Sequence, residues 1–196
     1  MKVVAFNGSP HKNGNTSIAI NIIFEQLQQE GISTEMVQVG GMDIGGCKAC
    51  QKCRQKKDGF CYGYDNDRDD ILNDCVKKIY EAEGLIIASP VYFGSVTPET
   101  KALIDRVGYI VRSTGSGNLL KRKVGAAVAV VRRQGAGTVL EQINNLFALS
   151  EIIVPYSSYW NMAIGREKGE ILNDAEGVST LKKLGENMGW LLKKLF

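Results

Sequence analysis

The stretch that decides the fold is Lys2–Ser17, KVVAFNGSPHKNGNTS, which joins an apolar run to the start of an amphipathic segment. The run at Val3–Phe6 contains no polar residue, as expected of a strand that is covered on both faces in a parallel sheet. From Thr16 onward apolar residues recur at helical spacing, with Ile18 and Ile22 four residues apart. The sequence therefore predicts a strand, a polar loop and a helix, in that order.

The loop between these elements is suited to a phosphate group. A helix N-terminus offers backbone N–H groups and the positive end of the helix dipole, which attract an anion. The loop is not a P-loop, because five residues separate Gly8 from Gly14 and no lysine follows. It also lacks the G-x-G-x-x-G pattern of dinucleotide sites. An ordinary polar connection that caps the helix is the alternative. Side-chain donors are available at Ser9, Asn15, Thr16 and Ser17.

Length and composition limit what can be built on this loop. The 196 residues, 44% of them apolar, fit one domain with a sizeable core. The net charge is +3, and the basic residues are scattered among acids, unlike the basic stripe of a nucleic-acid binder. No apolar run approaches the roughly 20 residues of a membrane span, and no signal peptide precedes the first strand. We expect a soluble, cytoplasmic protein without nucleic-acid or membrane partners.

A second strand and a long loop follow the first helix. The helix should end near Gly31, and the residues from Ser33 to Val39 alternate enough to form a strand. The chain then enters a loop at 40–67 that is rich in glycine, lysine and cysteine. Loops of this length within a compact domain are usually functional. A helix is expected from Asp69 to Ala82.

Four of the five cysteines lie in this loop, at Cys47, Cys50, Cys53 and Cys61, in the pattern C-x2-C-x2-C-x7-C. Four thiolates suit either a cubane iron–sulfur cluster or a tetrahedral zinc ion. The tight triple favours iron–sulfur, since structural zinc sites more often use two separated C-x2-C pairs. Disulfides, which a reducing cytoplasm disfavours, and free thiols are the alternatives. Cys75 falls on the apolar face of a predicted helix, which indicates a buried residue.

A second functional loop follows the apolar run Gly84–Ser89. This run is expected to be a central strand, and it leads into PVYFG at Pro90–Gly94. In a doubly wound sheet such a loop lies beside the first loop at the carboxyl edge, where ligands bind. Tyr92 and Phe93 offer aromatic surface, and a glycine lets the backbone approach a flat ring system. The alternative is that these aromatics pack the loop onto its own domain.

These segments together resemble a known family. The residues GSPHKNGNT at Gly8–Thr16, the cysteine pattern and SPVYFGSVTPETKALIDR at Ser89–Arg106 are similar to the NADPH-dependent FMN reductase superfamily of flavodoxin-like proteins. The cysteine spacing narrows the resemblance to its iron–sulfur flavoproteins. It covers essentially the whole chain. The seven-residue spacing before Cys61 is at the long end of the expected range.

The resemblance implies FMN, a [4Fe–4S] cluster, electron exchange with ferredoxin or NAD(P)H as donor, and a homodimer or dimer of dimers. No residue need act as an acid or base. The FMN phosphate would contact Ser9, His11, Asn13, Asn15, Thr16 and Ser17. The isoalloxazine ring would contact Pro90, Val91, Tyr92, Phe93 and Gly94, with Gly135 at its edge. The cluster would be held by Cys47, Cys50, Cys53 and Cys61.

The remaining chain completes one α/β domain over residues 1–196. We expect a strand at Lys123–Val131, a third loop around Gly135, a helix at Thr138–Leu149 and a fifth strand at Ile152–Pro155. A helix over Asp174–Phe196 closes the fold. This order predicts a flavodoxin-like, doubly wound five-stranded parallel sheet, 2-1-3-4-5, with the cysteine-rich insert after the second strand.

Three functional hypotheses are consistent with the sequence. The first is an iron–sulfur flavoprotein that transfers electrons between a reduced donor and an acceptor through FMN and the cluster. The second is a flavin-only NAD(P)H-dependent reductase of FMN, quinones or metal ions, with empty or zinc-bound cysteines. The third is an electron carrier or sensor with no substrate pocket.

Overall fold

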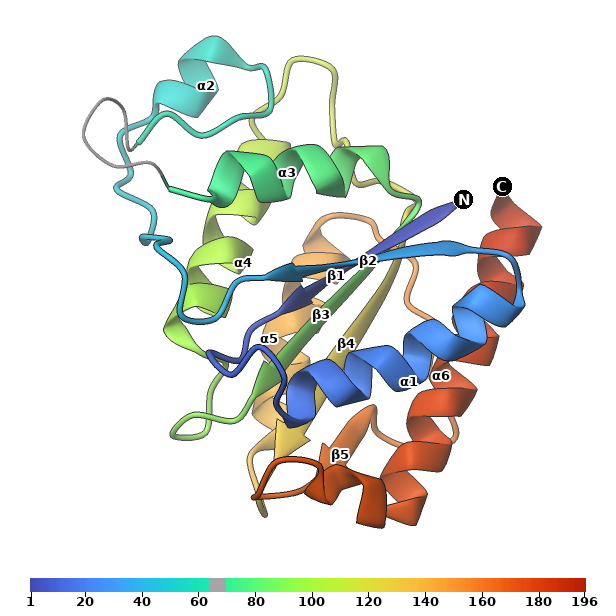
Figure 1. Ribbon diagram of the computed structural model, residues 1–196. Helices are drawn as coiled ribbons and strands as arrows, with labels where there is room; N and C mark the ends of the chain where they lie inside the picture. The colour runs from blue at the N-terminus through green and yellow to red at the C-terminus, as the bar shows by residue number, and fades with distance from the viewer. Residues whose placement is uncertain (64–69) are drawn as a thin grey trace.

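The computed structural model describes residues 1–63 and 70–196 and has a three-layer α/β architecture (Figure 1). Its strands form one parallel sheet in the order β2-β1-β3-β4-β5, which confirms the predicted topology. The described part of the chain contains no helix that is long and apolar enough to cross a membrane. The strands are β1 (Lys2–Asn7), β2 (Ser33–Gln38), β3 (Gly84–Pro90), β4 (Val124–Val131) and β5 (Met162–Ile164).

Helices cover both faces of the sheet (Figure 1). Alternate residues of β1 therefore enter different cores, Val4 and Phe6 on one face, Val3 and Ala5 on the other. This two-sided burial is the reason that β1, β3 and β4 are uninterrupted apolar runs. One face is covered by α1 (Asn15–Gln29) and α6 (Ala175–Leu195), and the other by α3 (Leu72–Glu81), α4 (Pro98–Val111) and α5 (Ala136–Leu149).

The predicted fifth strand at Ile152–Pro155 is wrong. In that segment Ile153 alone forms a β-bridge, to Val124 at the start of β4. The chain then leaves the sheet, since Pro155 has no N–H to continue a ladder. It returns at Met162–Ile164, which pairs with Ala129–Val131 at the other end of β4. The fifth position of the sheet is thus filled by two separate segments.

The other boundaries agree with the sequence to within a few residues. Gly31 follows α1 with φ +75°, as expected of a left-handed residue after a helix. Helix α5 begins at Ala136, two residues before the predicted Thr138. Helix α3 begins at Leu72, and the predicted start at Asp69 lies outside the described residues, as do residues 64–67 of the cysteine-rich loop. Two short helices were not predicted, α2 (Lys52–Lys56) and the 3-10 helix η1 (Glu170–Asn173).

Asp174 should stabilise the fold at the edge of the sheet. Its Oδ1 accepts the Gly177 N–H at 3.0 Å as the N-cap of α6, and its Oδ2 accepts the Ile164 N–H of β5 at 2.7 Å. We expect Asp174→Ala to lower the free energy of unfolding by about 1–2 kcal/mol. Urea denaturation measures this change. The exposed Glu176 of the same turn is the control, and Glu176→Ala should change stability by less than about 0.5 kcal/mol. Equal effects would contradict the assignment.

Candidate functional site

Three loops meet at the carboxyl edge of the sheet. We call residues 8–14 the phosphate loop and residues 91–96 the ring loop; the third loop, residues 132–135, leads into α5. The Gly8 N–H donates to the Ala88 carbonyl at 2.8 Å, and the Thr97 hydroxyl donates to the Gly8 carbonyl at 2.8 Å. A Cβ at Gly135 would lie 2.7 Å from the Val91 side chain. The predicted juxtaposition of the three loops is therefore present.

Two glycines allow this close packing. A Cβ on Gly8 would lie 2.0 Å from the Thr100 hydroxyl oxygen, and one on Gly40 would lie 2.3 Å from the Gly8 carbonyl oxygen. Both contacts are too short for any side chain. Gly40 belongs to the start of the long loop after β2. The phosphate loop is thus held between the segments that follow β2 and β3.

A pair of hydrogen-bonded amide side chains also shapes the phosphate loop. Asn7 is fully buried; its Oδ1 accepts the Ser9 N–H at 3.0 Å, and its Nδ2 donates to Gln38 at 2.9 Å. The Gln38 amide in turn donates to the carbonyls of Ser9 and Gly40, both at 2.6 Å. Asn7, Gln38 and Gly40 were not among the predicted site residues. A polar residue at the end of an apolar strand was the available signal for Asn7.

The six predicted phosphate ligands lie in two environments. Ser9, Thr16 and Ser17 are buried, whereas His11 and Asn13 are exposed. The Ser9 Oγ accepts the His11 N–H at 3.2 Å, and the Ser17 hydroxyl donates to the Gly14 carbonyl at 2.8 Å. Helix α1 has Gly14 as its N-cap, so no side chain caps it. Its first-turn amides are thus directed at the phosphate loop, an arrangement that favours an anion.

Asn15, the sixth predicted phosphate ligand, forms hydrogen bonds with a segment that is distant in the sequence. Its Nδ2 donates to the Glu167 carbonyl at 2.9 Å, and its Oδ1 accepts the Gly169 N–H at 2.7 Å. The Glu170 carboxylate caps the same segment by accepting the Arg166 and Glu167 N–H groups. Both ends of the Asn15 amide therefore fix residues 166–169 beside the start of α1. A direct role of Asn15 at a phosphate stays a prediction.

The ring loop is a tight turn that presents its aromatic side chain to solvent. Tyr92 and Ser95 exchange two backbone hydrogen bonds, at 2.9 and 3.0 Å. Between them Phe93 has φ +48° and Gly94 has φ +76°, the pattern of a type I′ turn. Positive φ is costly for phenylalanine, and such strain is concentrated at functional sites. Phe93 is fully exposed and Tyr92 is 42% exposed. Both are thus available to a planar ligand, with Pro90 and Val91 at the base of the loop.

The four loop thiols gather around one small cavity. Cys47, Cys50, Cys53 and Cys61 all line it. A Cβ on Gly63 would lie 3.7 Å from the sulfurs of both Cys50 and Cys61. Within residues 1–63 and 70–196, however, no group of three or more Cys, His, Asp or Glu side chains has the arrangement of a metal site. Cys75 is separate, and burial raises the pKa of its thiol to about 12.

The backbone between the thiols is bent by left-handed residues. Ala49 has φ +51° and Gln51 has φ +64°, each between two cysteines, and Lys57 has φ +57° after α2. In this conformation the Ala49 N–H donates to the Cys47 sulfur at 3.4 Å. Three non-glycine residues with positive φ thus lie in one short segment, and such a concentration of backbone strain is typical of functional sites. With this backbone, thiols that are separated by two residues line the same cavity.

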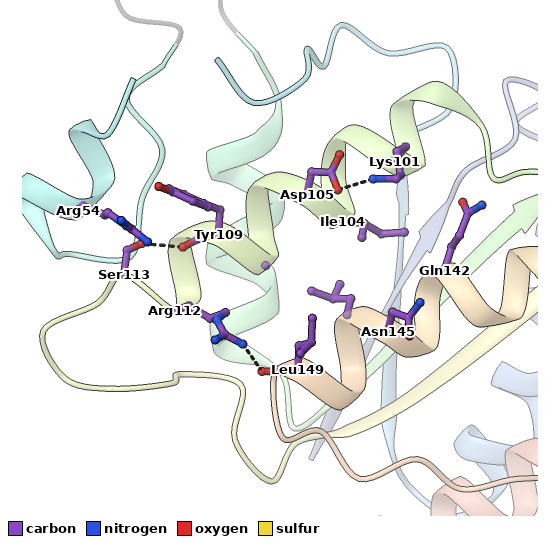
Figure 2. A pocket seen from close by; sticks show the side chains of 12 residues that line it. Arg54, Lys101, Ile104, Asp105, Tyr109, Arg112, Ser113, Gln142, Asn145 and Leu149 are labelled. Carbon is purple, nitrogen blue, oxygen red and sulfur yellow. Dashed lines mark hydrogen bonds and ion pairs between the residues drawn. The ribbon is translucent and has the colours of Figure 1, made fainter. Parts of the chain in front are cut away.

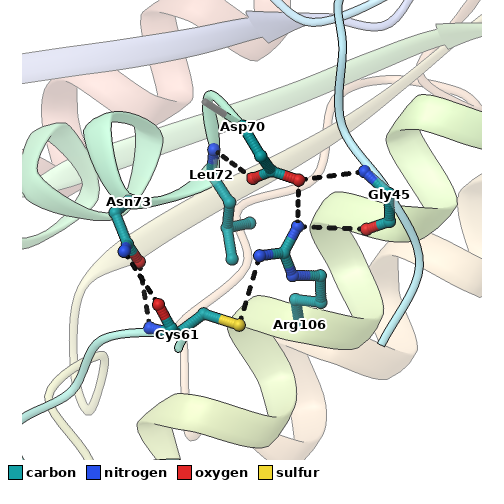
Figure 3. A network of polar contacts seen from close by, with 6 residues as sticks. All are labelled: Gly45, Cys61, Asp70, Leu72, Asn73 and Arg106. Carbon is teal, nitrogen blue, oxygen red and sulfur yellow. Dashed lines mark hydrogen bonds and ion pairs between the residues drawn. The ribbon is translucent and has the colours of Figure 1, made fainter. Parts of the chain in front are cut away.

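A buried ion pair fastens this loop to α4 (Figure 3). The Arg106 guanidinium contacts the Asp70 carboxylate at 2.5 Å, and both side chains are almost fully buried. The same guanidinium donates to the Gly45 carbonyl at 3.0 Å and to the Cys61 sulfur at 3.2 Å. Burial lowers the pKa of Arg106, but the hydrogen bonds to Asp70 and Cys61 outweigh it and raise the pKa. Neither residue was among the predicted site residues.

A separate cavity of about 410 Å³ lies between α4 and α5 (Figure 2). Arg54 of α2 reaches its rim and lies over the Tyr109 ring, 5.1 Å from the centroid. The Tyr109 hydroxyl also donates to Gln51 at 2.9 Å. These contacts hold α2 and the cysteine loop against the outer face of α4. The cavity is thus next to the thiols rather than at the phosphate loop.

The comparisons with known proteins identify the family of this chain. Residues 1–167 match the NADPH-dependent FMN reductase family. The chain belongs to this family. It is accordingly an FMN-binding, flavin-dependent oxidoreductase. An iron–sulfur flavoprotein of Methanocaldococcus jannaschii is 36% identical to it over 98% of both chains.

Solved structures of flavoproteins share the fold. RosB with a bound 8-demethyl-8-formylriboflavin-5'-phosphate intermediate gives a TM-score of 0.74 at 19% identity, covering 100% of this chain and 80% of RosB. A WrbA-like flavodoxin of Agrobacterium tumefaciens gives a TM-score of 0.66 at 12% identity, covering 98% of this chain and 97% of that one. At these identities the likeness establishes the flavodoxin-like fold alone.

Gly14 should be essential for FMN retention. A Cβ there would lie 3.0 Å from the His11 Cβ and 3.2 Å from the His11 carbonyl oxygen. We expect Gly14→Val to displace the phosphate loop and lose FMN while the protein stays folded. Flavin absorbance per purified chain measures the loss. Gly115→Ala is the control, since its Cβ meets only ordinary contacts at 3.7 Å. Stoichiometric flavin in Gly14→Val would show that this loop binds another ligand.

Gly94 should be essential for the geometry of the ring loop. Open space surrounds it, but its φ of +76° is unfavourable for a β-branched residue. We expect Gly94→Val to weaken FMN binding or to shift the flavin reduction potential, because the turn can no longer hold its backbone against the ring. Flavin titration and spectroelectrochemistry measure these changes. Gly117→Val, with φ +89° in a different loop, controls for backbone strain alone.

Proposed function

We propose that this protein transfers electrons between a reduced donor, ferredoxin or NAD(P)H, and an acceptor through FMN and a [4Fe–4S] cluster. FMN would bind at the phosphate and ring loops. Cys47, Cys50, Cys53 and Cys61 would hold the cluster. The observation that carries the proposal is that four thiols line one cavity beside α4, the helix that begins directly after the ring loop.

The chemistry of the residues present suits both groups. On the flavin side, no side chain caps the N-terminus of α1, so its first-turn N–H groups would be available to a phosphate. On the cysteine side, soft thiolates suit iron, and the Cys47 and Cys61 sulfurs accept N–H hydrogen bonds of the kind that tune such clusters.

Each part of the chain would then have a distinct task. When bound, flavin accepts a hydride or two single electrons and a cubane cluster passes one electron at a time, so the pair links two-electron to one-electron carriers. The phosphate loop would anchor the FMN phosphate, and the ring loop would orient the isoalloxazine ring. The cysteine loop would position the thiolates. No side chain is required to donate or accept a proton.

The basic surface of the cysteine loop favours an acidic redox partner. Lys48, Arg54, Lys56 and Lys57 are exposed around the thiols, and within the described part of the loop, residues 40–63, the acidic residues are Asp43 and Asp58. A positive patch around a redox centre raises the encounter rate of an acidic carrier. This supports ferredoxin as donor or acceptor. Its association should weaken as ionic strength rises.

Two alternatives remain as outcomes of simple measurements. A flavin-only NAD(P)H reductase with empty or zinc-bound cysteines would contain FMN but no iron or sulfide after anaerobic purification. A carrier or sensor without a substrate pocket would show no steady-state NAD(P)H oxidation. The full-length similarity to an iron–sulfur flavoprotein favours the cluster.

We further propose that the chain forms a homodimer, or a dimer of dimers. The segment that leaves the sheet before β5 exposes Tyr156, Tyr159 and Trp160, each more than half accessible. Clustered exposed aromatics indicate a protein interface.

We expect Trp160→Asp to lower the oligomeric state measured by analytical ultracentrifugation, whereas Trp190→Asp on α6, equally exposed at 61%, should not. A monomeric native protein would contradict the proposal.

The cluster assignment is tested by Cys50→Ser and Cys75→Ala. Removing one thiolate from a four-ligand cubane exposes an iron, so Cys50→Ser should abolish cluster content. Cys75→Ala trims a buried contact worth about 1 kcal/mol and should leave the cluster intact. FMN should remain in both variants, because its loops come from other segments. Iron and acid-labile sulfide assays on anaerobic protein decide the question; full occupancy in Cys50→Ser, or loss in Cys75→Ala, would overturn the assignment.

A further inference from the structure

Among residues 1–63 and 70–196, one arginine is buried, and it contacts the cysteine loop. Arg106 lies on α4 with its residue only 2% exposed. Arginine is almost never fully buried without compensation, because removing its charge from water is costly. Asp70 supplies the compensating charge, and its side chain is 3% exposed. The salt bridge alone would satisfy this requirement, but the guanidinium also donates hydrogen bonds to the cysteine loop.

The guanidinium joins both limbs of the cysteine loop. It donates to the Gly45 carbonyl, two residues before Cys47, and to the sulfur of Cys61 at the other end. Asp70 accepts the Gly45 N–H at 3.0 Å and the Leu72 N–H at 2.9 Å, so the carboxylate is fixed from two sides (Figure 3). Limbs separated by sixteen residues of sequence are thereby held at one point on α4.

Cys61 is held by its backbone as well as its sulfur. The Cys61 N–H donates to the Asn73 Oδ1 at 2.9 Å, and the Asn73 Nδ2 donates to the Cys61 carbonyl at 2.9 Å. Asn73 thus fixes the main chain, while Arg106 fixes the direction of the thiol. The two contacts come from different helices, α3 and α4. This matters because seven residues separate Cys61 from the nearest other cysteine of the motif, Cys53.

We propose that Arg106 is a positioning residue that orients the Cys61 thiolate toward the other three sulfurs and raises the reduction potential of the cluster they hold. An N–H donor to a ligand sulfur stabilises the more negative, reduced state, and the positive charge acts in the same direction. This inference rests on the proposed function in so far as the group is a cluster. The orienting role concerns the thiolate itself and applies to any thiophilic metal.

Lysine cannot reproduce this arrangement. The planar guanidinium donates through one nitrogen to Asp70 and through the other to Cys61. A single ammonium keeps the charge but lacks the fork that reaches both acceptors at once. Arg106→Lys therefore removes the orienting contact while retaining the buried ion pair. Arg112→Lys is the matched control, since Arg112 is the C-cap of the same helix but is exposed and donates to the Leu149 carbonyl.

The first experiment titrates the full-length, metal-free protein anaerobically with Cd²⁺ and follows thiolate-to-metal absorption. We expect Arg106→Lys to lower the affinity for Cd²⁺ roughly 10- to 100-fold, the range for loss of a group that orients a ligand. Arg112→Lys should leave it unchanged. In a Cys61→Ser background Arg106→Lys should cause no further loss, because its effect passes through that sulfur. Unchanged affinity in Arg106→Lys, or losses that add in the double variant, would overturn the proposal.

The second experiment measures the cluster potential by spectroelectrochemistry. We expect a shift to more negative values in Arg106→Lys, with wild-type FMN content; an unchanged potential would overturn the electrostatic role. Arg106→Gln is a second variant with the same expected direction. Failure of both to fold, while Arg112→Lys folds, would show a purely structural role and overturn the proposal. If the native chain assembles no cluster but Arg106→Lys still loses Cd²⁺ affinity, the proposed function fails and the role of Arg106 stands.

Discussion

Two hydrogen bonds of the Gly8 backbone, one from its N–H and one to its carbonyl, determine how the loops of the site are arranged. Its N–H donates to Ala88 at the end of β3, and its carbonyl accepts the Thr97 hydroxyl at the start of α4. Because β1 and β3 are neighbours in the sheet, these bonds fix the phosphate loop against the ring loop. The approach is possible only where Gly8 and Gly40 have no side chain. A ligand that spans both loops would thus meet a preorganised site and lose less entropy on binding.

Helix α4 connects the phosphate and ring loops to the cysteine loop. Thr97 caps its N-terminus beside the phosphate loop, and Arg106 holds the cysteine loop further along the same helix. Nine residues of helix separate them, about 14 Å along the axis at the usual rise per residue. Since a helix is stiff, the two parts of the site have a defined separation. The redox partnership proposed for this protein depends on that separation.

The sequence predicted the secondary structure correctly where it depends on residues that are close together in the chain. Continuous apolar runs identified β1, β3 and β4 because helices cover both faces of the sheet. The same reasoning failed at Ile152–Pro155, whose apolar residues are also suited to a strand. Only one of them pairs with β4, and the segment that completes the sheet, Met162–Ile164, is too short to stand out in a pattern. Whether such a segment forms a strand depends on its pairing with a neighbouring strand, and the periodicity of the sequence contains no information on that pairing.

By itself the sequence determined the order of the sheet, the position of the phosphate and ring loops at its carboxyl edge and the four cysteines of the long loop, because each depends on residue types at short spacing. The tertiary structure alone revealed Gln38, Gly40 and the Asp70–Arg106 pair. These residues come from segments far apart in the chain, and their importance depends on which backbone or sulfur they meet. An arginine in an amphipathic helix is ordinarily solvent-exposed. Only the fold shows that Arg106 is buried, neutralised by Asp70 and directed at Cys61.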